Sequence, residues 1–130
     1  MRKLIPVIFI VAVAFASCKK GPGEGGDSSI KGLVFVQEWN SSFTYHDSTL
    51  DHVGMDEDVY IIYGDDATYG DRIKSGPDGV FEFKYLRTGK YKVYVYTQDT
   101  VAGGQSAVQK EVEITSKDQI ADAGTFTIKD

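Results

Sequence analysis

Short runs of alternating apolar and polar residues fill the chain from Ile30 onward. They are rich in β-branched and aromatic residues, are separated by Gly, Asp, Asn and Ser clusters, and lack a sustained helical period. The pattern predicts an all-β protein, and seven strands are typical of an antiparallel two-sheet sandwich. The predicted strands are 30–37, 58–63, 72–74, 80–85, 90–98, 107–114 and 124–129.

Alternation with a period of two also divides the side chains of these strands between two faces. A turn is predicted at 76–79, because Asp78-Gly79 supplies the positive φ that a tight turn needs. Gly89 has a similar role before the next strand. The residues predicted to face the core are Phe81, Phe83, Leu86, Tyr91, Val93 and Val95.

A different pattern occupies the start of the chain. Arg2 and Lys3 precede an uninterrupted apolar run at 4–16, and small residues follow it just before Cys18. This order is that of a cleaved secretory signal peptide, which we place at 1–17. The apolar run is shorter than the roughly 20 residues that a helix needs to cross a bilayer.

The junction Phe15-Ala16-Ser17-Cys18 resembles the lipobox of bacterial lipoproteins, although leucine is commoner where Phe15 stands. The resemblance implies that Cys18, the only cysteine, carries a lipid thioether and begins the mature chain. Two or three acyl chains on one residue give stable membrane anchoring. Similarity to Gram-negative lipoproteins, with no Asp after Cys18, favours the outer membrane, facing either the periplasm or the cell surface.

Residues 18–29 are predicted to form the lipidated cysteine and a flexible linker, because they are rich in Gly and Pro and carry no apolar side chain after Cys18. Residues 30–130 then form one domain. Without Arg2 and Lys3 the chain has 12 basic and 19 acidic side chains, a formal charge of −7, and no basic patch. This charge argues against nucleic acid as a partner.

The Asp78-Gly79 turn, the alternating strand after it and the motif Gly89-x-Tyr91-x-Val93-x-Val95 carry a resemblance to a known family. They are similar to the carboxypeptidase regulatory-like family, and residues 122–128 are similar to its last strand. The resemblance covers 30–130 and implies a transthyretin-like (prealbumin-type) β-sandwich. It implies no activity, because one sandwich fold hosts many unrelated sites.

Tyr60, Tyr94 and Tyr96 are predicted to point away from the core, on strands that could bring them together. Exposed tyrosines can stack on sugar rings or anchor a protein partner, because they combine a broad apolar ring with a polar tip. The alternative is that the stretch 38–57 or the edge of the other sheet covers these side chains.

The stretch 38–57 is longer than an ordinary loop and holds both histidines, His46 and His52, among several aspartates. Histidine with carboxylate is the raw material of a metal site, and a polar surface loop collects the same residues without binding a metal. The chain has no Gly-x-Ser-x-Gly motif of a nucleophilic serine.

These observations favour a non-enzymatic outer-membrane lipoprotein without a cofactor, held at the membrane through Cys18, whose sandwich is a binding or structural module. The expected partner is a protein or a glycan. One alternative is a glycan-binding surface protein that uses Tyr60, Tyr94 and Tyr96. The other is a small metal-dependent enzyme that uses His46 and His52.

Overall fold

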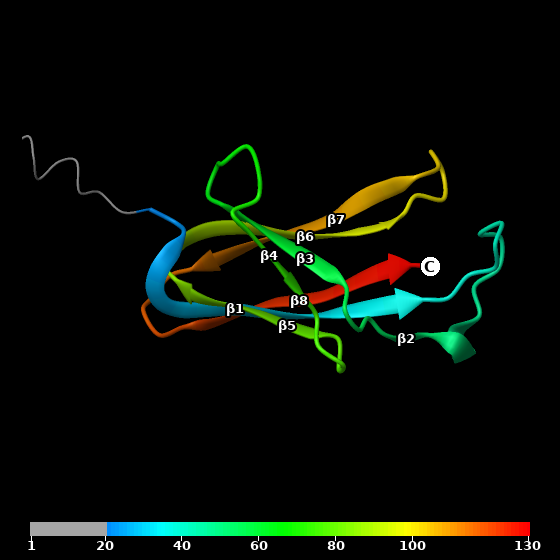
Figure 1. Cartoon of the computed structure of the whole chain (residues 1–130), viewed down its shortest axis with the longest axis horizontal. Coiled ribbons are helices and arrows are strands. Elements are labelled where there is room, and N and C mark those ends of the chain that lie inside the picture. The colour runs from blue at the N-terminus through cyan, green and yellow to red at the C-terminus, as the bar shows by residue number, and fades with distance from the viewer. Residues whose placement is uncertain (1–20) are drawn as a thin grey trace, which may run out of the picture.

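The computed structural model describes residues 21–130, and these form two β-sheets packed face to face (Figure 1). The expected signal peptide and Cys18 lie outside the described residues. Within the described range no helix is long and apolar enough to span a membrane, and the helical element is a 3₁₀ turn, η1 (Ser48–Leu50). The strands are β1 (Glu24–Gln37), β2 (His52–Val53), β3 (Asp58–Tyr63), β4 (Asp71–Lys74), β5 (Val80–Leu86), β6 (Gly89–Gln98), β7 (Gln105–Ile114) and β8 (Ile120–Lys129).

The first sheet is built around β1. One edge of β1 pairs antiparallel with β5 and, further along, with β2, while its other edge pairs with β8. The β1–β8 pairing is parallel, which corrects the expectation of a wholly antiparallel sandwich. Alternation assigns the faces of a strand but not its partner, so the sequence pattern left this pairing open.

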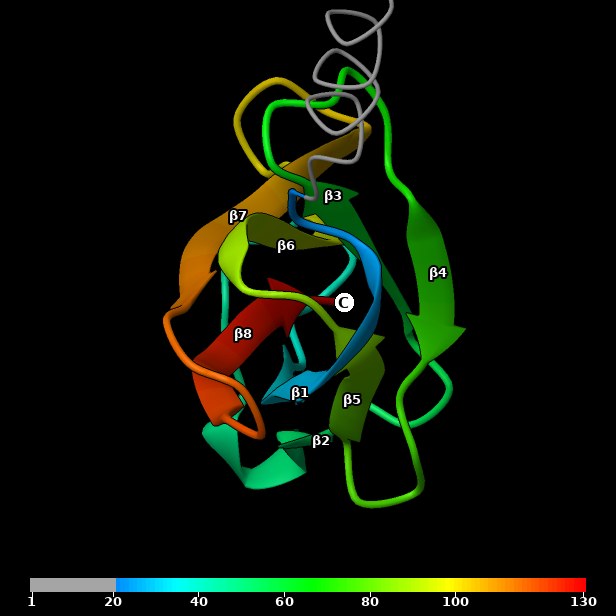
Figure 2. The same ribbon diagram turned by 90° about the vertical axis from the view of Figure 1, so that its left-hand side faces the viewer.

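The second sheet has the order β4-β3-β6-β7, and all its pairings are antiparallel. Figure 2 views the molecule end-on and shows this sheet lying over β8, β1 and β5. The space between the two sheets holds the core, in which the Phe81 and Phe126 rings lie 5.6 Å apart. All six side chains that alternation placed in the core are buried, which confirms that prediction.

The fold has eight strands rather than seven, because the short β2 lies inside the stretch expected to be a loop. β2 pairs with β1 at only two positions, Val53 and His52, and both of its side chains are exposed. A strand this short and exposed carries no alternation that a sequence pattern could reveal.

The flexible linker expected over 18–29 is corrected over 24–29, because β1 begins at Glu24. Residues 18–20 lie outside the described range. Ser28 and Ser29 are buried, and the Ser28 hydroxyl donates to the Ser116 carbonyl at 3.0 Å. The segment joins the sheet through its backbone, with a bulge between Glu24 and Ser28. Apolar side chains are not needed for such pairing, so their absence did not mean disorder.

The turn at 76–79 forms as predicted. The Gly76 amide donates to the Val80 carbonyl and the Gly79 amide to the Gly76 carbonyl, both at 2.9 Å. Gly79 has a φ of +79°, a conformation that favours glycine. The turn starts β5 in the register that puts Phe81 and Phe83 in the core.

Candidate functional site

The three tyrosines predicted to face outward lie together on the outer face of the second sheet. Tyr60 of β3 is directly opposite Tyr94 of β6, and their rings stack with centroids 4.8 Å apart and planes 6° apart. The Tyr96 ring meets both edge-on, 5.4 Å from Tyr60 and 5.6 Å from Tyr94. Antiparallel pairing produces this arrangement, because directly opposite residues share a face.

A fourth tyrosine, which alternation did not find, joins this group. Tyr69 comes from the connection between β3 and β4, and its ring lies 5.0 Å from that of Tyr60 at an interplanar angle of 69°. It lies outside any strand, so no periodic pattern marks it. We call Tyr60, Tyr69, Tyr94 and Tyr96 the tyrosine cluster.

The tyrosine cluster remains open to solvent. Tyr69 and Tyr96 are 46% and 44% exposed, while the stacked pair of Tyr60 and Tyr94 is half-buried between them. The alternative that a loop or a sheet edge covers these side chains is therefore not what the structure shows. The result is a stacked aromatic pair in contact with two more accessible rings.

Arg72 adds a positive charge beside the tyrosine cluster, opposite Tyr60 on β4. A hydrogen bond with Tyr60, and then the charge of Asp58, raise the pKa of Arg72 further above its usual range. Burial, and then the neighbouring Tyr96, raise the pKa of Tyr94. At neutral pH the surface thus offers phenol hydroxyls, which both donate and accept hydrogen bonds, next to a guanidinium that only donates.

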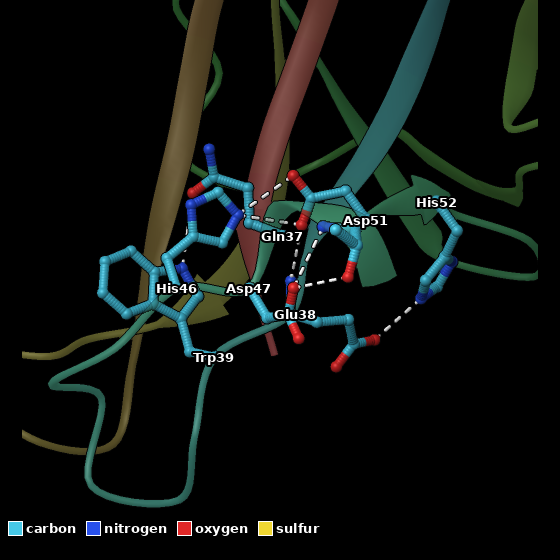
Figure 3. Close-up of polar contacts among 8 residues, drawn as sticks. Gln37, Glu38, Trp39, His46, Asp47, Asp51 and His52 are labelled. Carbon is cyan, nitrogen blue, oxygen red and sulfur yellow. Dashed lines mark hydrogen bonds and ion pairs between the residues drawn. The ribbon is translucent and has the colours of Figure 1, made fainter.

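The histidines of the 38–57 stretch occupy two separate contacts (Figure 3). His46 Nε2 lies 2.8 Å and 3.0 Å from the two carboxylate oxygens of Asp51, and its ring stacks on Trp39 with centroids 5.1 Å apart. Burial opposes ionisation of Asp51, but hydrogen bonds from His46 and the Glu38 amide outweigh it and lower the pKa of Asp51. Asp51 thereby links Glu38, at the start of the stretch, to His46 in its middle.

His52 pairs with a different carboxylate, with Nε2 2.8 Å from Glu38 Oε1 and Nδ1 2.8 Å from the Val53 carbonyl. These two contacts raise the pKa of His52. His46 and His52 share no carboxylate, and residues 21–130 contain no group of three or more His, Cys, Asp or Glu placed to hold a metal ion. Each histidine instead contacts groups of the same stretch, His46 with Asp51 and His52 with Glu38 and Val53.

No protein-family model matches the chain. No curated protein matches it either. Among solved structures, a crystal structure from Pseudomonas aeruginosa, of a protein described as a putative carbohydrate binding protein, is similar over 92% of this chain and 96% of that one. The identity is 12% and the TM-score 0.46, so the likeness is confined to the β-rich fold and carries no argument about function.

Proposed function

We propose that this protein is a non-enzymatic, lipid-anchored binding module of the outer membrane, and that the tyrosine cluster is its contact surface. The membrane part of the proposal rests on the sequence of the first 18 residues, with its lipobox-like junction at Cys18. The non-enzymatic part rests on the chain's lack of a recognisable nucleophile motif and on the pairing of each histidine with its own carboxylate.

The observation that carries the binding proposal is a group of four tyrosine rings at one open sheet face, in which Tyr60 contacts the other three. Tyrosine is enriched at binding hot spots because its large ring has few rotatable bonds and so loses little entropy on binding. Ring stacking and edge contacts restrain these side chains before any ligand arrives. The surface is therefore preorganised, and preorganisation reduces the entropic cost of binding.

The ligand class that suits the cluster best is a glycan. The exposed rings of Tyr69 and Tyr96 offer apolar area to the C–H face of a sugar, and Arg72 together with the phenol hydroxyls can hydrogen-bond to sugar hydroxyls. A protein partner anchored by the same tyrosines is the second candidate. Tyr69 and Tyr96, the most exposed rings of the cluster, would be its anchors.

The fold is proposed to be transthyretin-like in its finer detail. Support comes from the motif residues, since Phe81, Tyr91, Val93 and Val95 are all core residues and the 76–79 turn forms before β5. An experimental structure with a strand order other than β8-β1-β5 and β4-β3-β6-β7 would remove this support.

Isothermal titration of the protein with cell-envelope and dietary polysaccharides tests the glycan proposal. We expect Tyr96→Ala and Tyr69→Ala each to weaken binding at least tenfold, equivalent to about 1.4 kcal/mol. Tyr45→Ala removes an exposed tyrosine of the 38–57 stretch and is the matched control, with unchanged affinity. Binding that is equally strong in all three variants would remove the cluster as the site.

Cross-linking of intact cells tests the second candidate with the same variants. A partner cross-linked to the wild-type protein and the control but lost from Tyr96→Ala supports a protein ligand. The membrane anchor is tested separately, because mass spectrometry of the mature protein reports directly whether Cys18 carries lipid.

A further inference from the structure

The first described residues, 21–24, are bound to one end of the sandwich. The Gly23 amide donates to the Tyr91 hydroxyl at 2.8 Å, and the Gly23 carbonyl accepts from the Arg87 amide at 2.8 Å. The same Tyr91 hydroxyl donates to the Arg87 carbonyl at 2.6 Å. Tyr91 is buried in the core, so its hydroxyl is positioned by packing as well as by these bonds.

The side chain of Arg87 holds the segment on both sides of Gly23. Its Nε donates to the Gly21 carbonyl at 2.6 Å, and a terminal guanidinium nitrogen donates to the Glu24 carbonyl. Tyr63 adds a contact further along, as its hydroxyl donates to the Glu24 carboxylate at 3.2 Å. We call the Arg87 side chain and the Tyr91 hydroxyl the N-terminal clamp.

Pro22 fits against the sandwich where two glycines leave room for it. A Cβ atom on Gly89 would lie 2.4 Å from Pro22 Cγ, and one on Gly64 would lie 3.4 Å from the same atom. A side chain on Gly89 would therefore displace the proline. The hydrogen bonds of the N-terminal clamp and the close packing of Pro22 together hold residues 21–24.

We infer that the N-terminal clamp fixes the orientation of the domain at the membrane, by leaving only a short tether between a lipidated Cys18 and the fold. This inference rests on the proposed lipid anchor. Gly21 follows Cys18 by three residues, which span at most about 11 Å. Without the clamp the tether would run to Glu24, where β1 begins, and could extend to about 22 Å. The clamp therefore shortens the tether roughly twofold.

The short tether keeps one particular end of the sandwich next to the lipid. Gly21, Thr88 and Lys117 line the same pocket at that end. The connection between β6 and β7, the 38–51 stretch and the C-terminus lie at the opposite end, as Figure 1 shows. The sheets then stand upright on the membrane, with the tyrosine cluster on a lateral face.

Hydrogen exchange of the lipidated protein in vesicles of phosphatidylethanolamine and phosphatidylglycerol tests the clamp. We expect the amides of 21–27 to be protected in the wild type and to exchange about tenfold faster in Arg87→Ala, which loses two hydrogen bonds. Lys90→Ala, an exposed residue near the clamp, is the control with unchanged exchange. Exchange of 21–27 at the rate of an unstructured chain in the wild type would overturn the clamp.

Tyr91→Phe tests the clamp by a second route, because it keeps the buried ring and removes only the hydroxyl. We expect faster exchange at Gly23 while the amides of β6 and β7 stay protected. Unchanged exchange at Gly23 in this variant and in Arg87→Ala would mean that something other than the clamp holds the segment.

Fluorophores attached at Thr88→Cys and Val101→Cys, in separate proteins, test the orientation. Lipids with a quencher in the headgroup should quench the label at position 88 several times more strongly than the label at position 101. Adding Arg87→Ala should reduce this ratio. Equal quenching at both positions in the clamped protein would overturn the orientation. Mass spectrometry showing an unmodified Cys18 would instead end the lipid-anchor proposal, and hydrogen exchange would still report on the clamp.

Discussion

The two faces of the β3–β6 strand pair carry different kinds of residue at adjacent positions. On the inner face, Ile61 lies opposite Val93, and both are fully buried between the sheets. One residue away on the outer face, Tyr60 lies opposite Tyr94 in a stacked pair that borders solvent. The backbone pairing is continuous across both pairs, so only the side chains distinguish them.

This difference separates what the fold requires from what it leaves free. The inner face must exclude water and fill volume, which aliphatic side chains do at little cost. The outer face of an antiparallel sheet commonly faces solvent and can be polar throughout. Four tyrosine rings gather at this outer face, three from its strands and Tyr69 from the β3–β4 connection, and we propose this face as the contact surface.

The largest expected effect is on the inner face, where Ile61→Ala leaves a cavity. We expect it to lower the free energy of unfolding by about 2 to 5 kcal/mol. Ile62→Ala removes the same atoms from the neighbouring outer position and should cost less than about 1.5 kcal/mol. Urea unfolding of both variants measures the two changes in the free energy of unfolding. Equal losses would mean that the two faces are not distinguished by burial.

A double-mutant cycle on the stacked pair sharpens the comparison at the outer face. Tyr60→Ala, Tyr94→Ala and the double variant should give a coupling energy of about 0.5 to 1.5 kcal/mol, the range for aromatic pairs. The measurement is again the free energy of unfolding in urea. Additive losses would show that the rings lie side by side without stabilising each other, which would weaken the argument for a preorganised surface.

The smallest expected effect is a change in the free energy of unfolding at alkaline pH. Burial raises the pKa of Tyr91 on the inner face, and burial followed by Tyr96 raises that of Tyr94 on the outer face. A raised pKa means that the folded state retains the proton that the unfolded state loses above about pH 10. The free energy of unfolding should therefore fall as the pH rises above that value.

Tyrosinate absorbance measures this titration, with the urea-unfolded protein as the reference. In the folded protein a fraction of the eight tyrosines should titrate late, and Tyr94→Phe should remove part of that fraction. A folded protein whose tyrosines all titrate as in urea would contradict the expected shielding of both faces.

Local patterns predicted much of the fold. Alternation placed Phe81, Phe83 and Val93 in the core, and Asp78-Gly79 marked the turn before β5. The errors arose where structure depends on distant partners. Residues 24–29 join the sheet through backbone pairing, and β8 pairs parallel with β1, features that side-chain periodicity does not encode.

The candidate site was predictable for the same reason and to the same extent. Because Tyr60, Tyr94 and Tyr96 lie in strands, alternation along those strands predicted that their side chains share one face. Tyr69 lies in a connection, where no period exists, and its position depends on how the chain returns from β3 to β4. The separate pairing of His46 and His52 depends on the three-dimensional path of the 38–57 stretch, which length and composition do not specify.

The parallel pairing of β1 with β8 bears on how the chain reaches its native state. The two strands are separated by most of the folded sequence, and closing so long a loop is slow because many conformations must be searched first. The first sheet cannot be completed until β8 (Ile120–Lys129) is available to pair with β1. We therefore expect the assembly of this sheet, rather than of the second sheet with its antiparallel pairings, to limit the rate of folding.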